Sequence, residues 1–294
     1  MDIDKPLPAG TVPITIRDVD GIDEARAAEQ LQAEVWGMDD RDLTPFTHLV
    51  AVKKVGGQLI GAFDGATLVG FVYGFLGLEH GESIHHSHLL AVKPAYRNHE
   101  IGYRLKLAQR EAVLAQGVGR MSWTFDPLQS ANAHLNFHKL GATSDSYKVN
   151  FYGAGTSSFL HRVGTDRFWL TWELDSPRVR QRLHDGAPPL QPHDVPPLVR
   201  MAADGSPEEV ELAPAAALAG RQALIEIPHD INACGREHPQ RALRWRELTR
   251  RAFGEALAAG FRVEDFERAT RDGQRFGIYV LGRGGERNPA ETRA

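Results

Sequence analysis

The chain has 294 residues, with 34 basic and 38 acidic side chains, so its formal net charge is −4 with histidine neutral. At about 100 to 200 residues per domain, this length allows two domains. The apolar content of 42% excludes intrinsic disorder and a fibrous architecture, and the mild acidity gives no electrostatic support for nucleic-acid binding.

Two further classes of protein are excluded by the residues themselves. No apolar stretch approaches the ~18 residues that span a bilayer, and the chain begins with MDIDKPLPAG, which has neither a basic leader nor an apolar core. We therefore expect a cytoplasmic protein that does not enter a membrane. Cys234 is the single cysteine, so an internal disulfide and a zinc finger built from cysteines are excluded.

The first predicted elements are a helix over 23–35 and two strands over 59–63 and 68–75. The strands flank Asp64-Gly65-Ala66-Thr67, a turn that favours an antiparallel hairpin. A third strand covers 83–92. Because side chains alternate along a strand, four even positions are predicted to share one face: His86, His88, Leu90 and Val92.

Helices and strands then alternate. Apolar residues recur at helical spacing over 101–112, and two glycines follow, which suits the end of a helix. A short buried strand is predicted over 121–125, a second helix over 131–140 and a final strand over 168–174. This order predicts an α/β (α+β) fold, in which helices flank a mixed sheet.

The second part of the chain follows a proline-rich stretch at 185–197, which reads as an extended connector. Beyond it we predict a strand over 223–227, a helix over 239–259 and a hairpin of strands over 261–269 and 274–281. This β-α-β-β order loosely repeats the order of the first part, so a degenerate second copy of the same half-fold is an open alternative.

We therefore predict two domains. The first covers 12–175, the connector covers 176–197, and a smaller β-α-β-β part covers 198–283. Five arginines lie on the predicted helix of this second part, and we expect solvated positions around its apolar stripe: Arg241, Arg244, Arg246, Arg250 and Arg251.

The most informative stretch covers 86–105, where a strand leads through a basic turn into the start of a helix. Such a turn directs several backbone N–H groups and the positive end of the helix toward one point. The stretch therefore predicts an anion site, for which a pyrophosphate is a natural ligand.

Within this stretch, Val92-Lys93-Pro94, Tyr96-Arg97 and Gly102 resemble the signature of the GNAT superfamily of acyl-CoA-dependent N-acyltransferases. Gly102 stands in the last glycine position of the family's Gly-rich turn. Glu100 departs from the pattern, because it stands where the family has the first glycine. A carboxylate there would repel phosphates if it pointed toward them.

The resemblance implies a GNAT-like mixed sheet and acyl-CoA as co-substrate. It implies that backbone groups of the strand hold the pantetheine arm, and these are Leu90, Ala91 and Val92. It also implies that the turn holds the pyrophosphate through Arg97, Asn98, His99, Glu100, Ile101, Gly102 and Tyr103. A second match, at 132–142, implies cofactor contacts at Asn132 and at Phe137. At the position of Phe137 the family commonly has a tyrosine, which often donates a proton to the departing CoA thiolate.

The candidate base and the candidate acid for proton transfer are residues near this turn. Acylation needs a neutral amine, and histidine has the matching unperturbed pKa. His86 and His88 are therefore the predicted catalytic pair, as the likeness to the arylalkylamine branch of the family also implies. Since Phe137 cannot donate a proton, Tyr147 or Tyr152 could act as the acid, and we select Tyr152.

The predicted function is transfer of an acetyl group, or alternatively a succinyl group, from acetyl-CoA or succinyl-CoA to the amine of a small molecule, for example an amino acid. Arg167 is one of three arginines that could pair with a substrate carboxylate. A homodimer is compatible with these features. The main alternative is a non-catalytic acyl-CoA-binding sensor or scaffold domain, which Glu100 and Phe137 favour.

A metal site is a weaker alternative. Histidines two apart on a strand can share an ion, and Glu79 and Glu82 lie close in sequence to His85, His86 and His88. We assign no metal, because this reading leaves the residues after Val92 unexplained.

Overall fold

A computed structural model gives the fold, and it describes residues 13–153, 158, 161–187, 195–210 and 220–283. The chain divides into two compact units, residues 1–123 with 155–161 and residues 124–154 with 162–294. Each unit is described by itself. Across the described residues, a helix with the length and hydrophobicity of a membrane span is absent.

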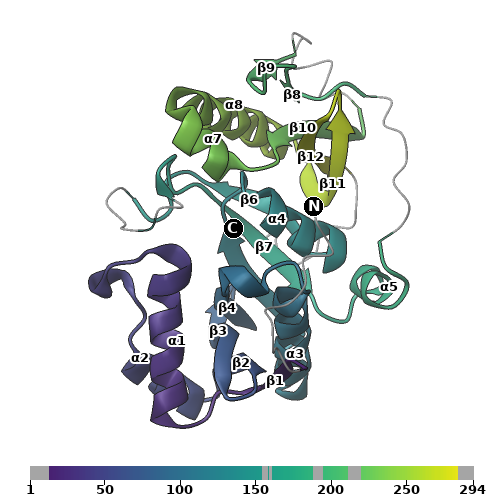
Figure 1. The fold of residues 1–294 in the computed structure, drawn as a ribbon. Coiled ribbons are helices and arrows are strands. Elements are labelled where there is room, and N and C mark those ends of the chain that lie inside the picture. Colours follow the sequence, from purple (N-terminus) through teal and green to yellow (C-terminus); the bar gives the residue numbers. More distant parts are fainter. Residues whose placement is uncertain (1–12, 154–157, 159–160, 188–194, 211–219, 284–294) are drawn as a thin grey trace. The chain divides into compact units, whose positions relative to one another are not determined.

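The first unit is a sheet with helices on both faces (Figure 1). Its elements are β1 (Thr15–Asp18), α1 (Gly21–Trp36), η1 (Asp40–Asp42), α2 (Phe46–Lys54), β2 (Gln58–Asp64), β3 (Thr67–Glu79), β4 (Glu82–Val92), η2 (Pro94–Tyr96), α3 (Ile101–Ala115) and β5 (Arg120–Phe125), whose last two residues belong to the second unit. Strands β1 to β4 pair antiparallel in chain order, and β5 pairs parallel to β4.

Local sequence explains where α1 begins and ends. The Asp20 side chain accepts a hydrogen bond from the Gly21 N–H at 3.0 Å, which caps the first turn. Gly37 adopts φ 62° just beyond the helix, a left-handed conformation that glycine takes without steric cost. The predicted helix at 23–35 and the hairpin around Asp64 are therefore confirmed.

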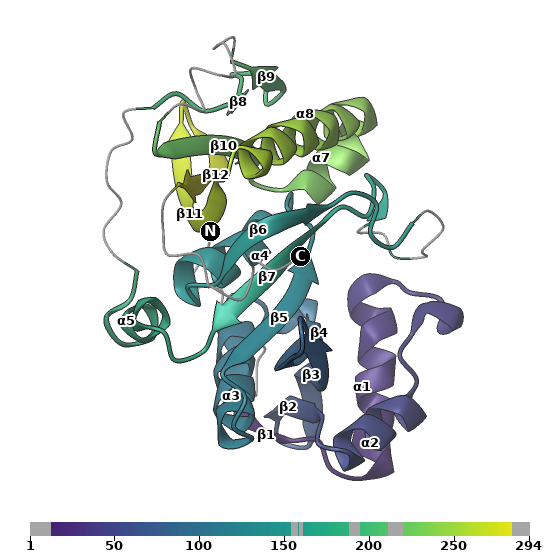
Figure 2. The ribbon, with the colours of Figure 1, turned by 180° about the vertical axis from the view of Figure 1, so that it is seen from behind.

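Two apolar layers cover the sheet of the first unit. On one face, Phe71 and Tyr73 of β3 pack with residues of α1 and α2. On the other face, Val72 of β3 packs with Ile101 and Leu105 of α3. Figures 1 and 2 show α1 and α2 on one side of the strands and α3 on the other.

The second unit contains the remaining elements: α4 (Ser130–Ala133), the π-helical η3 (His134–Lys139), β6 (Thr143–Lys148), β7 (Arg167–Glu173), α5 (Pro177–Asp185), β8 (Val199–Met201), β9 (Pro207–Glu209), β10 (Gln222–Pro228), α7 (Ile231–Glu237), α8 (Pro239–Ala258), β11 (Arg262–Arg271) and β12 (Gln274–Gly282). Its strands lie in the order β7-β6-β11-β12-β10-β8-β9. Figure 2 shows α7 and α8 beside β10.

The predicted α+β class and the strands and long helix of the C-terminal part are confirmed. The sequence patterns did not predict six further elements that the structure contains: β1, α2, β6, α7, β8 and β9. The single helix expected at 131–140 is instead α4 followed by a π-helical turn, in which the Leu140 N–H bonds to the Leu135 carbonyl at 3.0 Å.

The predicted connector also contains regular structure. Residues 177–185 form α5, whose first turn is capped by the Ser176 hydroxyl. The proline-rich residues 188–194 lie outside the described part of the chain. The division between the compact units falls within 12–175, because β6 pairs with β11 at Ser144 and Val263. The domain boundaries drawn from sequence stay predictions.

Candidate functional site

A β-bulge in β4 lies at the centre of the predicted site. Gly74 pairs with Ser87, and Tyr73 pairs with Leu89, so His88 is the extra residue on β4. A bulge of this kind bends the strand and interrupts its two-residue alternation. The alternation of side chains between the two faces of the sheet is therefore shifted by one residue after His88.

The bulge corrects the predicted face of β4. His86 and His88 lie on one face, with ring centroids 6.0 Å apart, and both contact Phe75. Leu90 and Val92 instead pack on the opposite face, against the α3 side of the sheet. The four even positions would share a face in a regular strand, and the extra residue moves the last two to the other side.

His86 lies in a half-buried setting between two strands. Its Nδ1 is 3.1 Å from the Ser122 hydroxyl of β5, and its ring centroid is 5.6 Å from that of Phe75. Burial, assisted by the neighbouring His88 and Lys106, lowers the pKa of His86 to about 4. His86 is therefore a neutral imidazole at pH 7.

His88 is exposed and lies beside aromatic rings. Its ring centroid is 6.2 Å from Tyr73, edge to face. Desolvation, with a contribution from His48 of α2, lowers the pKa of His88. Both predicted catalytic histidines are thus brought together in forms that can accept a proton.

His85 points away from this pair. It is fully buried, and its Nε2 lies 3.3 Å from Gln109 Nε2 of α3. The residues proposed for a shared metal are therefore split between the two faces of the sheet. Within the described residues, no group of three or more histidine, cysteine or acidic side chains is placed to hold a metal ion.

The turn after β4 is fixed to the neighbouring strands. The Lys93 N–H donates to the Val69 carbonyl at 2.9 Å, and the Tyr96 hydroxyl donates to Asp64 Oδ2 at 2.8 Å. Arg97 Nε donates to the Val92 carbonyl at 3.3 Å. Desolvation lowers the pKa of the Arg97 guanidinium, and an arginine keeps its charge at neutral pH in proteins.

Two residues of the turn adopt left-handed backbone conformations, Asn98 at φ 71° and Glu100 at φ 58°. The conformation of Glu100 explains why a glycine suits its position, since a side chain is strained there. Glu100 is exposed, and α3 begins at the next residue without a side-chain cap. The first N–H groups of α3 thus point beyond the helix end, where an anion is favoured.

The strand edge next to the turn can bind an extended ligand. Leu90, Ala91 and Val92 pair with β3 on one side. In the described structure, β4 pairs with β5 only at His85 and His86. Within the described residues of the first unit, β4 has no strand partner on the β5 side beyond these pairs, and an unpaired strand edge is the kind of backbone that an amide-containing chain can extend. The residues present therefore fit a pantetheine arm along β4 and phosphates at the turn.

The other predicted site residues belong to the second unit. Asn132 is exposed on α4. Phe137 is fully buried and packs edge to face against Phe168 and Tyr279. With no exposed surface on its side chain, Phe137 could contact a cofactor only through its backbone.

The two candidate acids differ in their surroundings. The Tyr152 hydroxyl lies 3.2 Å from the Thr124 hydroxyl, its side chain is 44% exposed, and the Arg167 guanidinium lies over its ring at 5.1 Å. The Tyr147 hydroxyl instead donates to Asp166 Oδ2 at 2.7 Å. Burial raises the pKa of Tyr147, and of the two hydroxyls that of Tyr152 belongs to the more exposed side chain.

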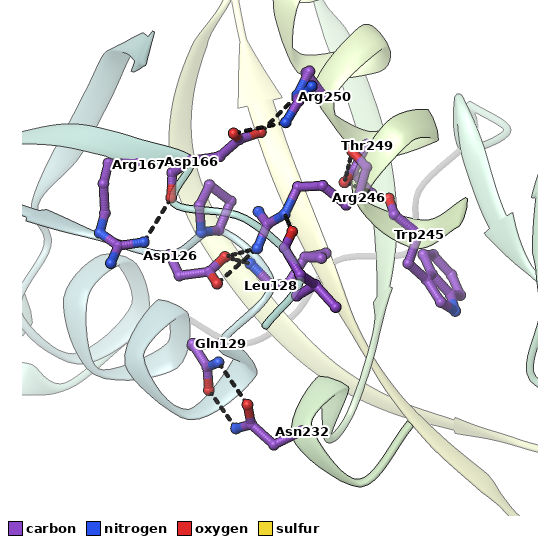
Figure 3. A network of polar contacts seen from close by, with 12 residues as sticks. Asp126, Leu128, Gln129, Asp166, Arg167, Asn232, Trp245, Arg246, Thr249 and Arg250 are labelled. Atoms are coloured by element: carbon purple, nitrogen blue, oxygen red, sulfur yellow. Dashed lines mark hydrogen bonds and ion pairs between the residues drawn. The ribbon is translucent and has the colours of Figure 1, made fainter. Parts of the chain in front are cut away.

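The expectation of solvated arginines on α8 is wrong for Arg246. Its guanidinium is buried, and one nitrogen lies 2.7 Å from both oxygens of Asp126. Arg250 binds both oxygens of Asp166 (Figure 3). Periodicity alone could not reveal these pairs, because the carboxylates lie more than 80 residues away in sequence.

Sequence reasoning also missed the hydroxyl partner of His86. Ser122 lies in the predicted strand at 121–125, and its contact depends on the parallel pairing of β4 with β5. Nothing in the local pattern around Ser122 distinguishes it from an ordinary strand residue.

Comparisons with known proteins give one family match and several similar solved structures. Residues 23–142 match the model of the acetyltransferase (GNAT) family, and no curated protein matches the chain. Similar solved structures include the ribosomal-protein-S18-alanine N-acetyltransferase from Escherichia coli, with 12% identity and a TM-score of 0.44 over 56% of this chain and 96% of that one. Another is aminoglycoside 6'-acetyltransferase type Ii, with 17% identity and a TM-score of 0.44 over 56% and 99%.

Proposed function

We propose that the chain acylates the amine of a small molecule, with His86 as the base, and the match of residues 23–142 to the acetyltransferase (GNAT) family supports this proposal. The family match favours an acyl-CoA-dependent N-acetyltransferase activity for this part of the chain. Bound acyl-CoA supplies a thioester, whose acyl group passes to the amine while the thiolate leaves. The single observation that carries the assignment of the base is the pair of neutral histidines at the bulge of β4.

His86 accepts a proton late in the reaction. An imidazole with a pKa of about 4 cannot deprotonate a free alkylammonium efficiently, but the amine nitrogen becomes strongly acidic once the new C–N bond has formed. The base role places the imidazole proton of His86 on Nδ1, where the Ser122 oxygen accepts it, so that Nε2 takes the substrate proton. Ser122 thereby orients the ring.

His88 is the route by which the proton leaves. It is exposed, and its ring centroid is 6.0 Å from that of His86. A neutral imidazole in this position can pass a proton to solvent. For the leaving thiolate, Tyr152 is the proposed acid, and water can also protonate it because a thiolate is a good leaving group.

The proposed donors and acceptors follow from the family and the sequence. Acetyl-CoA is the expected donor, and succinyl-CoA is the specific alternative. The proposed acceptor is a small primary amine, with amino acids as the first class to examine.

Replacing both histidines tests this function. We expect His86→Ala/His88→Ala to lower kcat by about 10²- to 10⁴-fold, the contribution of a general base, while the acceptor KM changes much less. His184→Ala is the matched control, since His184 is 89% exposed on α5. A double variant with the kcat of the wild type would overturn the assignment of the base. Binding of acyl-CoA without transfer to any amine would favour the sensor or scaffold alternative.

A further inference from the structure

Lys106 of α3 is a buried amine without an acidic partner. Its side chain is 2% exposed, and in the described part of the chain no carboxylate pairs with it. The ammonium donates to the Ser87 hydroxyl at 2.7 Å and lies 3.7 Å from the ring centroid of Trp123. Burial lowers the pKa of Lys106 well below its usual value. A group of this kind is costly to bury, so its position needs a reason.

The amine belongs to a chain of buried polar groups on the α3 face of β4. The Ser87 hydroxyl accepts from Lys106 and donates to Gln109 Oε1 at 2.7 Å. The Gln109 side-chain nitrogen lies 3.3 Å from His85 Nε2, and His85 Nδ1 has no partner among the described residues. Lys106 and Gln109 are three residues apart, so they present adjacent side chains on one face of α3.

The position of this network in the sheet is specific. Ser87 directly precedes the bulged residue His88. The last pair between β4 and β5 joins His86 to Ser122, so Ser87 and Trp123 are the first residues beyond it on their strands. Lys106 therefore contacts both strands where their pairing stops, on the face opposite His86.

The contact between Lys106 and Ser87 can specify the register of the bulged strand. A slip of one residue moves every side chain of a strand to the other face, which would turn His86 and His88 away from their common side. An apolar side chain in place of Lys106 would be cheaper to bury, but it would not distinguish Ser87 from its neighbours. A buried polar partner does, because any other register leaves the amine unsatisfied.

We infer that Lys106 is a positioning residue, which fixes the bulge of β4 through Ser87 and holds β4 and β5 at the point where they separate. The consequence for catalysis rests on the proposed function, because it acts through His86 and His88. The effect of Lys106 on the register of β4 does not depend on the proposed function.

The test compares Lys106→Met with Lys54→Met, a matched control at an exposed lysine of α2. Three quantities are measured: the melting temperature, hydrogen exchange of peptides covering β4, and acyl transfer. For Lys106→Met we expect exchange in β4 to be about tenfold faster, with α1 unchanged as the internal reference. We expect kcat to fall by about 10- to 100-fold, as misplaced catalytic groups produce, while the KM for acyl-CoA changes little and the melting temperature is retained or raised.

A second pair of variants guards against misfolding of Lys106→Met. Ser87→Ala removes the oxygen that links Lys106 to β4, and Ser83→Ala makes the same change at an exposed position of that strand. Ser87→Ala is expected to reproduce faster exchange and lower kcat, and Ser83→Ala to match the wild type. Wild-type exchange in β4 of the folded variants would overturn the inference, as would faster exchange with unchanged kcat. If the wild type transfers no acyl group, the proposed function fails, and the exchange measurement alone decides the register.

Discussion

At the scale of single residues, the site depends on desolvated side chains. His86 is half-buried between β4 and β5, and its partner is the uncharged Ser122 hydroxyl. A carboxylate partner would raise the pKa of an imidazole, whereas burial lowers it. His86 is thus suited to take a proton from a strongly acidic nitrogen and to release it quickly.

The pH dependence of transfer follows from this setting. Because the base acts when unprotonated, the rate should be lost only as pH falls through the pKa of His86, about 4. After correction for the neutral fraction of the acceptor amine, we expect a constant kcat/KM from about pH 6 to 8. A histidine with an ordinary pKa would instead make kcat/KM fall as the pH drops below about 6.5. Initial rates across this range measure it. A limb between about 6 and 7 would contradict a desolvated base.

Glu100 gives a second prediction at this scale. Its φ of 58° is strained for a side chain, and its carboxylate lies beside the proposed phosphate site. Glu100→Gly should raise stability by about 1 kcal/mol, and it should tighten acyl-CoA binding by about fivefold through loss of repulsion. Thermal melting and calorimetric titration measure the two effects.

A matched variant separates charge from backbone strain. Glu100→Gln keeps the strained conformation, so it should recover the gain in affinity without the gain in stability. Weaker binding by Glu100→Gly would mean that Glu100 contributes favourably to the cofactor site.

At the scale of elements, sequence patterns predicted where the chain forms regular structure. The apolar spacing from Ile101 predicted α3, and the Asp64 turn predicted the β2–β3 hairpin. The bulge at His88 was not predictable, because it depends on pairing with β3 rather than on the residues of β4 alone. The two-residue alternation therefore placed His86 and His88 on one face correctly but assigned Leu90 and Val92 to the wrong face.

One departure from the family pattern, Phe137, lies in the π-helical turn η3. Phe137 is fully buried among Phe125, Phe168 and Tyr279. We expect Phe137→Tyr to lose about 1 to 3 kcal/mol of stability, because a hydroxyl would be buried there without a partner. It should not raise kcat. Denaturant unfolding and the transfer rate check this, and a gain in kcat at unchanged stability would show that position 137 can serve as the acid.

At the scale of the whole molecule, buried ion pairs join residues distant in sequence within the second unit. Arg246 of α8 binds Asp126, which follows β5 directly, and both are nearly inaccessible. The sequence showed only an arginine on a helix, since the partner lies 120 residues away. Residues beyond 198 are therefore part of the same packed unit as 124–154.

Breaking this pair should destabilise the second unit strongly. Arg246→Met leaves the Asp126 carboxylate buried without its partner, at an expected cost of about 3 to 5 kcal/mol. Arg251→Met is the matched control, because Arg251 pairs with Glu209 at an exposed site, where an ion pair contributes about 0 to 1 kcal/mol. Denaturant unfolding measures both. Equal stability of the two variants would contradict a structural role for the buried pair.

We propose that the turn after β4 and the β4 backbone beyond its pairs with β5 bind acyl-CoA for transfer beside His86. Calorimetric titration of the purified protein with CoA, acetyl-CoA and succinyl-CoA tests it without knowledge of the acceptor. We expect one acyl-CoA to bind per chain with a Kd on the order of micromolar, about −8 kcal/mol, and the ranking of the two thioesters identifies the donor. Absence of binding by all three compounds at modest salt would show that this turn is not an acyl-CoA site.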